Sequence, residues 1–373
     1  MVLRNTRASW PGGHGFAICC SEKMSKSTRA SKSSRRRGLQ RHRRSPRTVC
    51  HPHVVVNGRF AGYVHLVAPA MDSLRRSPPP ATLAWAVGMV GSDAHLTRCR
   101  RLVGGITSSV HLLGVMDREG RTHGLVLKRW PQMPRSETTS MIEREARILG
   151  CLEDVKLPVP SLVAVSRPEE TDGCPALLMT QVPGRVDLAP RDPSSWIGQM
   201  AMTLASIHDL GLDAPASDPW TPTPEVEMPT WSSRPEVWER ADGILATPAP
   251  SGERFIHGDY QHFNLLWRRG RLSGILDWSI GGTGHPDRDV GHCRLNLAVL
   301  FSAEWAADFA RAYQAEAGRS IDGWWDIYEI SRYGDGHMRA TIPIQAGRRA
   351  DVDVDGMNDR VEHLLVEAMR ALG

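Results

Sequence analysis

The chain lacks any apolar run long enough to cross a membrane as a helix. A membrane-spanning helix needs roughly 18 consecutive apolar residues. No run of apolar residues in the 373-residue sequence approaches this length. Its seven cysteines stand at irregular spacings and form no metal-binding or disulfide pattern. We therefore expect a cytoplasmic protein that makes no membrane contact and keeps its thiols reduced.

Lysine is missing from the second half of the chain. Residues 191–373 contain 17 Arg, no Lys and 27 Asp or Glu, whereas residues 51–190 contain 16 basic and 13 acidic residues. An acidic region attracts cations, although salt screens this attraction over about 8 Å. The composition favours a cationic partner for the second half, such as an amine or an amino sugar.

The first 50 residues are strongly basic, with thirteen Lys or Arg and one acidic residue. They are rich in Arg, Ser and Gly and show no periodicity, so we expect residues 1–75 to be a disordered extension. One interpretation is a nucleic-acid-binding or targeting arm. We favour the other, in which translation of the working protein begins near Met71, because a charge run without a motif is weak evidence. A nucleic acid partner is therefore disfavoured.

The stretch from residue 255 to 291, FIHGDYQHFNLLWRRGRLSGILDWSIGGTGHPDRDVG, carries the strongest pattern. Apolar runs at 265–267 and 272–276 predict two antiparallel strands around an Arg/Gly turn. Asn264 precedes the first strand and Asp277 follows the second, so these residues should meet at the open end of the hairpin. Asp259 lies on the loop that leads into that end.

These three residue types suit phosphoryl transfer. A carboxylate beside an amide oxygen fits Mg²⁺, which prefers oxygen ligands and keeps phosphate oxygens or waters in its other positions. A separate loop aspartate can orient an attacking hydroxyl and accept its proton. We therefore expect Asn264 and Asp277 to bind Mg²⁺ and Asp259 to be the catalytic base.

With H-G-D-x-x-x-x-N followed by D-W-S, the stretch resembles the Brenner-type motif of the aminoglycoside phosphotransferase and choline kinase-like family, distant relatives of protein kinases. The resemblance implies an α+β, bilobal protein-kinase-like fold. A small β-rich N-lobe over residues 80–182 would bind the nucleotide, and a larger helical C-lobe over residues 183–373 would hold the catalytic and acceptor-binding groups. The implied phosphate donor is ATP, with GTP as the open alternative, and the implied cofactor is Mg²⁺.

The acceptor implied by the resemblance is a hydroxyl of a small molecule. H-G-D replaces the H-R-D of protein kinases, D-W-S replaces D-F-G, and no activation segment with A-P-E follows. A protein acceptor is therefore disfavoured. Aminoglycosides, macrolides, choline-like amines, amino alcohols and sugars all remain open, as does the oligomeric state. A catalytically silent nucleotide-binding module is the alternative to an enzyme.

The resemblance also assigns the nucleotide-binding residues of the N-lobe. We expect the run from Leu102 to Met116 to form a strand, a Gly/Ser-rich turn and a second strand. Gly105, Thr107 and Ser108 of this turn would bring backbone N–H groups against phosphates, whereas an ordinary hairpin turn is the alternative for such a turn alone. Lys128 ends the next strand, where it would reach the phosphates.

Two further elements complete the expected nucleotide site. The helical pattern over residues 141–152 carries Glu145, which the resemblance makes the partner of Lys128, with Glu143 as the alternative. The resemblance places the hinge between the lobes after the strand at 176–180. There, Gln181 and Val182 would offer one backbone acceptor and one donor to the adenine.

The remaining C-lobe residues have supporting roles. The resemblance makes Asp289 a buried acid that hydrogen-bonds the backbone near the catalytic loop, with His257 as a second structural support. We expect a helix over residues 194–210 with a Ser cap and a packed His208. His292 and Cys293 are adjacent and so point to different helix faces, which argues against a metal site.

Two other features have competing interpretations. Trp220, Trp231 and Trp238 lie in a Pro-rich segment, where anchoring to the core is favoured over lining an acceptor pocket.

The EF-hand sequence pattern is satisfied by Asp351, Asp353, Asp355, Gly356 and Glu362. The preceding TIPIQAGRRA predicts no entering helix and a second hand is absent, so we favour a solvated acidic loop before a last helix over 360–372. Lining of a cationic substrate's pocket is the other alternative to calcium binding.

Overall fold

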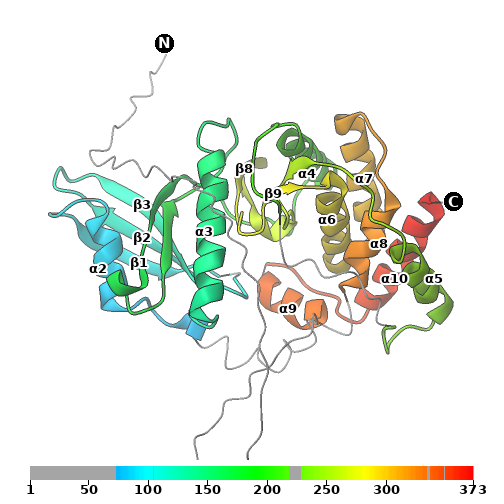
Figure 1. The fold of residues 1–373 in the computed structure, drawn as a ribbon, viewed down its shortest axis with the longest axis horizontal. Helices are drawn as coiled ribbons and strands as arrows, with labels where there is room; N and C mark the ends of the chain where they lie inside the picture. Colours follow the sequence, from blue (N-terminus) through cyan, green and yellow to red (C-terminus); the bar gives the residue numbers. More distant parts are fainter. Residues whose placement is uncertain (1–72, 104, 218–227, 334–336, 348, 373) are drawn as a thin grey trace, which may run out of the picture. The chain divides into compact units, whose positions relative to one another are not determined.

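The computed structural model describes residues 73–103, 105–217, 228–333, 337–347 and 349–372 (Figure 1). Almost all of the predicted extension over residues 1–75 lies outside these ranges, as do Gly104 and Trp220. All described residues belong to one compact unit, residues 55–373. Within the described ranges, no helix combines the length and the apolar character that a membrane crossing requires.

The first part of this unit is built on an antiparallel five-stranded sheet with the order β1-β2-β3-β5-β4. Its strands are β1 (His95–Arg101), β2 (Ser109–Met116), β3 (Thr122–Arg129), β4 (Leu162–Val165) and β5 (Ala176–Thr180). In the centre of the sheet Lys128 of β3 pairs with Leu177 of β5. Strand β1 ends at Arg101, just before the run beginning at Leu102 in which we expected the first strand. Its sequence HLTRCRR is largely exposed and lacks the apolar alternation by which strands are recognised.

Helices cover both faces of this sheet (Figure 1). On one face, α2 (Pro80–Gly88) packs Trp85 against a cluster that includes Leu127. On the other, α3 (Arg135–Cys151) lies with its buried Ile148 in the same cluster as Leu177. Because side chains alternate along a strand, Leu127 faces α2 and the adjacent Lys128 faces α3.

The second part is helical and is built around α6, which is buried along nearly its whole length. Its helices are α4 (Pro193–His208), α5 (Pro235–Leu245), α6 (Pro286–Leu300), α7 (Ala303–Ala317), α8 (Gly323–Ser331), α9 (His337–Ala346) and α10 (Met357–Ala371). Helix α6 contacts α7, α8 and α10, as Figure 1 shows. Polar groups on α6 must therefore find partners inside the protein, because an unpaired buried polar group is costly.

Two small antiparallel pairs of strands lie against the helices α4 and α6. The hairpin of β7 (Leu265–Arg268) and β8 (Arg271–Ile275) confirms the predicted one. Arg269 and Gly270 at its tip have φ values of 53° and 73°, as two-residue hairpin turns of type I′ require. The second pair joins β6 (Arg254–Ile256) to β9 (Gly282–Gly284). Between β6 and β7 the chain forms the short helix η4 (His262–Asn264).

Two sequence-based expectations about helices are wrong. The cap of α4 is Asp192, whose carboxylate accepts a hydrogen bond of 3.0 Å from the Ser195 N–H, and no Ser caps this helix. The sequence TIPIQAGRRA, residues 341–350, was expected to be non-helical. Its first part instead belongs to α9, which contains Pro343. Its Ile342 and Ala346 are buried, and tertiary packing of such a face can stabilise a helix that its local sequence disfavours.

Candidate active site

Lys128 joins the two parts of the unit. Its Nζ lies 2.8 Å from Oε2 of Glu145 and 2.7 Å from Oδ1 of Asp277. Glu145 is on the buried face of α3, in phase with Ile142, whereas Glu143 is exposed. Helical periodicity therefore explains why Glu145 and not Glu143 is the carboxylate that reaches Lys128.

The electrostatics of this cluster follow from burial and pairing. Burial lowers the pKa of Lys128, but the Asp277 and Glu145 carboxylates outweigh it and raise that pKa above its ordinary value. Burial raises the pKa of Asp277, and the ammonium of Lys128 more than compensates, so the net shift is downward. Lys128 and Asp277 are thus held as charged groups, and the cluster offers both a cation and a carboxylate to a ligand.

Asp277 follows the last residues of β8 in an unusual backbone conformation. Its φ is 64°, in the left-handed region that Asp tolerates better than most other residues. Its Oδ1 accepts hydrogen bonds from Lys128 and, at 2.8 Å, from Ser279 Oγ. One carboxylate oxygen is thereby fixed by protein donors, and Oδ2 is the atom better suited to bind a metal.

The loop that carries Asp259 depends on a glycine. Gly258 has a φ of 83°, and a Cβ at this position would lie 2.4 Å from the backbone oxygen of Ile280. The close approach of the 277–281 segment therefore excludes any side chain at residue 258. This steric limit gives a physical reason for glycine in the H-G-D sequence.

Asp289 holds the same loop from α6. Its two carboxylate oxygens accept hydrogen bonds of 2.7 Å each from the N–H groups of His257 and Gly258. His208 lies 3.2 Å from Asp289, and its other ring nitrogen is 2.7 Å from the Tyr313 hydroxyl. Burial raises the pKa of Asp289, but the hydrogen bond from His208 and the other donors lower it overall. Asp289 is a buried charged anchor for the loop backbone.

His257 links the loop to the strand that ends in Asp277. The Asp259 N–H donates to His257 Nδ1 over 3.2 Å, so Nε2 carries the proton and donates to the Leu276 carbonyl oxygen over 2.9 Å. Burial lowers the pKa of His257, which agrees with this neutral tautomer. The ring positions Asp259 relative to Asp277 and is not itself poised as a base.

Asp259 is surrounded by three side-chain donors. Asn264 Nδ2 lies 2.8 Å from its Oδ2. Gln261 Nε2 and His292 Nε2 lie 2.6 and 2.8 Å from its Oδ1. Gln261 was not predicted from the sequence, and His292 was weighed there only as a metal ligand and disfavoured in that role. The missed signal is helical phase, since His292 follows Asp289 by three residues and so lies on the same face of α6.

Asn264 is oriented so that it can also bind a metal. Its Nδ2 donates to the Asp259 backbone oxygen and to Oδ2, over 2.9 and 2.8 Å, which leaves its Oδ1 for another partner. The Leu276 N–H donates to the Asn264 backbone oxygen over 2.8 Å, so this hydrogen bond brings Asn264 close to Asp277, the residue after Leu276, at the open end of the hairpin. These two oxygen donors fit Mg²⁺, which takes one or two protein oxygens together with phosphates. No group of three or more His, Cys, Asp or Glu that could hold a metal occurs among the described residues.

The predicted nucleotide-binding turn connects β1 to β2. A Cβ on Gly105 would lie 2.7 Å from the backbone oxygen of Ser108, so the turn closes tightly on itself. Ser108 is buried and Thr107 is exposed. At the predicted hinge, the Gln181 N–H donates to the Gly124 oxygen over 3.0 Å. The backbone of Gln181 can therefore offer only its carbonyl oxygen to an adenine ring. The backbone N–H of Val182 would then be the hydrogen-bond donor to that ring.

The EF-hand-like residues have other partners. Glu362 is buried and accepts hydrogen bonds from Ser232 Oγ and, at 3.2 Å, from Trp238 Nε1. Asp353 forms an ion pair of 2.7 Å with Arg360. Two of the residues that would bind calcium in an EF-hand, Asp353 and Glu362, thus already interact with other side chains of the protein. The same contact anchors the buried Trp238 in the core, as expected for the tryptophans of this segment.

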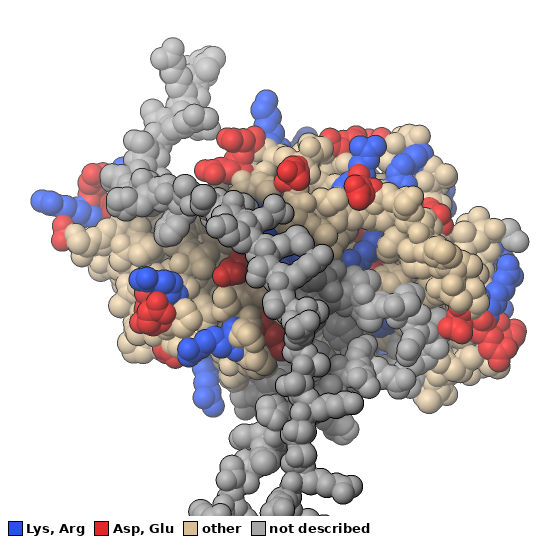
Figure 2. All heavy atoms as spheres, viewed as in Figure 1, with Lys and Arg blue, Asp and Glu red and all other residues tan. Residues whose placement is uncertain are grey.

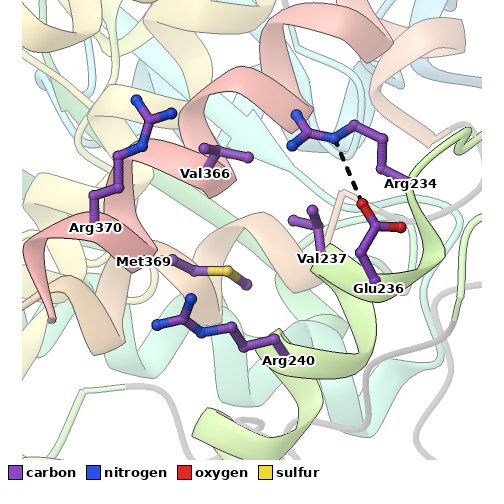
Figure 3. Close-up of a pocket in the computed structure, with 7 residues that line it drawn as sticks. All are labelled: Arg234, Glu236, Val237, Arg240, Val366, Met369 and Arg370. Atoms are coloured by element: carbon purple, nitrogen blue, oxygen red, sulfur yellow. Dashed lines mark ion pairs between the residues drawn. The ribbon is translucent and has the colours of Figure 1, made fainter.

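A separate hollow of about 270 Å³ lies between α5 and α10. Figure 3 shows Arg234, Arg240 and Arg370 around an apolar floor that includes Val237 and Met369. None of the predicted catalytic or nucleotide-binding residues lines it. Where described residues form the face shown in Figure 2, acidic and basic side chains are interspersed.

Comparison with known proteins gives a family match. The model of the phosphotransferase enzyme family matches residues 99–324, more than half of the chain. This range begins in β1 and ends in α8, so it contains Lys128, Glu145 and the whole stretch from 255 to 291. A crystal structure provisionally described as an aminoglycoside phosphotransferase of Ralstonia eutropha JMP134 has a TM-score of 0.51 and 20% identity. It covers 78% of this chain and 98% of that one, and at this identity it shows the fold alone.

Curated relatives match across a shorter part of their own length. Acyl-CoA dehydrogenase family member 10 of Mus musculus is 25% identical over 258 residues, which are 61% of this chain and 23% of that protein. Acyl-CoA dehydrogenase family member 11 of Homo sapiens is 22% identical over 193 residues, 46% of this chain and 25% of that protein. The chain thus spans about a quarter of the length of these relatives.

Proposed function

Because the chain belongs to the phosphotransferase enzyme family, we propose that it transfers the γ-phosphate of ATP to a hydroxyl group of a small molecule. The enzyme is a small-molecule kinase with a protein-kinase-like fold. In this proposal residues 80–182 form the nucleotide-binding N-lobe and residues 183–373 the catalytic and acceptor-binding C-lobe. GTP remains the alternative donor.

One observation carries the proposal. The ion pair of Lys128 with Asp277 and the hydrogen-bonded pair of Asp259 with Asn264 come together at the open end of one hairpin. A cation for phosphates, two oxygen donors for a metal and a separate carboxylate are the parts that phosphoryl transfer needs. A structural ion pair alone would not need the second carboxylate or the amide.

Each of these residues has a proposed task. Lys128, held by Glu145, supplies positive charge to the phosphates. The turn with Gly105, Thr107 and Ser108 supplies backbone N–H groups to them, and Gln181 with Val182 binds the base. When bound to Asn264 and Asp277, Mg²⁺ would neutralise phosphate charge.

Asp259 orients the acceptor hydroxyl and receives its proton, while His257 and Asp289 hold the loop. As the acceptor O–H bond breaks, its electron pair forms the new bond between oxygen and phosphorus. The bridging P–O bond of ATP breaks, and its electron pair remains on the oxygen of the leaving ADP. This chemistry depends on positioning and electrostatics and needs no covalent intermediate.

The acceptor that we propose is a cationic small molecule, such as an amino sugar or an amino alcohol. The support is the composition of residues 191–373, which contain no Lys and an excess of acidic residues. Long-range attraction of this kind falls steeply with salt. A cationic acceptor should therefore show a KM that rises with ionic strength, and a neutral sugar should not.

The test is an ATP-consumption screen over aminoglycosides, macrolides, choline-like amines, amino alcohols and sugars, with mass spectrometry of the product. Asp259→Ala serves as the blank and should bind ATP while losing transfer. Asp308→Ala, which removes an exposed carboxylate from α7, is the matched control and should keep full activity. Acceptor-independent ATP consumption that is equal in wild type and Asp259→Ala would contradict the proposal. Mg·ATP binding without turnover on any acceptor would support a catalytically silent module instead.

A further inference from the structure

His292 on α6 lies between two carboxylates from different elements. Its Nε2 is 2.8 Å from Oδ1 of Asp259, and its Nδ1 is 3.1 Å from Oε2 of Glu329 on α8. The His292 side chain is 19% exposed and that of Glu329 only 2%. The ring is therefore a largely buried bridge between the proposed base and the helical core.

The geometry fixes the protonation of this ring. Ionised carboxylates only accept hydrogen bonds, so each ring nitrogen must carry a proton to bond the oxygen that it faces. Asn296 Nδ2 also lies 3.2 Å from Nε2 and donates to the His292 backbone oxygen over 2.9 Å, but the contact of Nε2 with Asp259 Oδ1 is shorter, at 2.8 Å, and needs a proton on Nε2. The ring is thus an imidazolium. In agreement, its pKa is raised to about 9, because the hydrogen bonds and charges of Asp259 and Glu329 outweigh burial, which lowers it.

Glu329 is itself held in place by cations. Its Oε1 lies 3.4 Å from Arg288 Nε and 3.3 Å from Arg332 Nη1. His262 of η4 also interacts with the ring, and burial lowers its pKa to about 3, so it carries no charge near neutral pH. His292 is therefore anchored on the Glu329 side, and this anchor lets it restrain Asp259.

The restraint distinguishes the two oxygens of Asp259. A carboxylate oxygen has two lone pairs. Gln261 and His292 both donate to Oδ1, which fills it, whereas the described side chains give Oδ2 one donor, from Asn264. Only Oδ2 keeps a lone pair with which to receive the proton of a hydroxyl.

We infer that His292 is a positioning residue for phosphoryl transfer, which fills Oδ1 of Asp259 and thereby presents Oδ2 to the acceptor hydroxyl. This inference rests on the proposed role of Asp259 as the base. The proton moves from the acceptor oxygen to Oδ2, and His292 keeps both of its own protons throughout. Glu329 acts one step further away, because it holds the ring in its charged and bridging state.

The first test needs no enzymatic turnover. Nitrogen-15 NMR of the full chain should show both ring nitrogens of His292 protonated at neutral pH, with a midpoint near the pKa of about 9. Glu329→Gln and Asp259→Asn should each lower that midpoint by about a unit or more, because each removes one charged hydrogen-bond partner. A ring that is neutral at pH 7, or whose titration neither variant changes, would overturn the inference.

The second test separates positioning from folding and from nucleotide binding. His292→Gln should lower kcat by on the order of 10- to 100-fold and leave the KM for ATP within a few-fold of wild type. His363→Gln, which changes an exposed histidine paired with Glu367 on α10, is the matched control and should keep wild-type kcat. If His292→Gln does not fold, Glu329→Gln provides the same comparison through loss of charge.

The outcomes distinguish this inference from the proposed function. Wild-type activity with an unchanged kcat in His292→Gln contradicts the positioning role alone. Absence of transfer by the wild-type enzyme contradicts the proposed function, and the NMR result then still decides whether His292 is the charged bridge. Above the pKa of about 9, the ring has one proton for two carboxylates. The kcat of wild type should therefore fall through this pH, and His292→Gln should lack that alkaline limb.

Discussion

The Nζ of Lys128 lies 2.7 Å from Oδ1 of Asp277, a residue 149 positions further along the chain. The same ammonium is 2.8 Å from Glu145. One buried cation thus connects the central strand of the sheet, the helix α3 on its face and the end of the β7–β8 hairpin. In the proposed function this contact brings the phosphate-binding cation and the metal-binding carboxylate together.

Replacing Lys128 by Met should destabilise the protein as well as abolish ATP binding. Glu145 is 1% exposed and would be left without its cation. Breaking a buried ion pair on one side typically costs about 3–5 kcal/mol. Urea unfolding of Lys128→Met should show this loss, and the double variant Lys128→Met/Glu145→Gln should recover part of it. Equal stability of Lys128→Met and wild type would argue against the buried pairing.

Gly258→Ala should disrupt the catalytic loop. The added Cβ would meet the Ile280 backbone oxygen at 2.4 Å, at a φ of 83°. We expect kcat to fall by roughly 100-fold or more, since displacement of catalytic groups by about 1 Å has this effect. Gly198→Ala in α4, where nothing lies within 4 Å, is the control and should stabilise the helix by about 0.5–1 kcal/mol. Normal kinetics for Gly258→Ala would show that the loop does not need glycine.

The charge of His292 should make stability depend on pH on the alkaline side. Its pKa is raised from 6.5 to about 9 in the folded chain. The stabilisation is therefore complete below pH 6.5 and is lost as pH rises to about 9, by on the order of 3 kcal/mol. Urea unfolding across this range should show a decline in wild type and a flatter profile in His292→Gln. Parallel profiles would contradict the assignment.

His262 should have the opposite effect on the acid side. Neither of its ring nitrogens has a hydrogen-bond partner in the described part of the chain, and burial lowers its pKa from 6.5 to about 3. The neutral ring is compatible with the fold above pH 6.5, and stability is lost as pH falls from there towards 3. His262→Phe, next to Phe263 and Phe301, should unfold at a lower pH than wild type. Acid unfolding at the same pH would contradict this.

The sequence was most informative where short-range rules determine the structure. The β7–β8 hairpin follows from alternation and an Arg-Gly turn, and it brings the segments of Asn264 and Asp277 together whatever the rest of the chain does. The contact of Lys128 with Glu145 could be predicted only from the resemblance to the family motif. Helical phase, which places Glu145 and not Glu143 on the buried face of α3, could have resolved that alternative from the sequence alone.

The environment of Asp259 was much less accessible to prediction. His292 and Glu329 are 33 and 70 positions from Asp259, on separate helices, and their contact depends on how α6 packs against α8. No local pattern encodes that packing. The exposed, polar strand β1 and the Pro-containing helix α9 were missed for a related reason, because each is held by partners that local periodicity does not reveal.

The most direct test of the central claim is the initial rate of γ-phosphate transfer from labelled ATP to an acceptor found by the screen, compared between wild type and Asp259→Asn. We expect a loss of roughly 100- to 10,000-fold in kcat, the usual contribution of a positioned base, with Mg·ATP affinity within a few-fold of wild type. An Asp259→Asn variant that transfers phosphate at nearly the wild-type rate would contradict it.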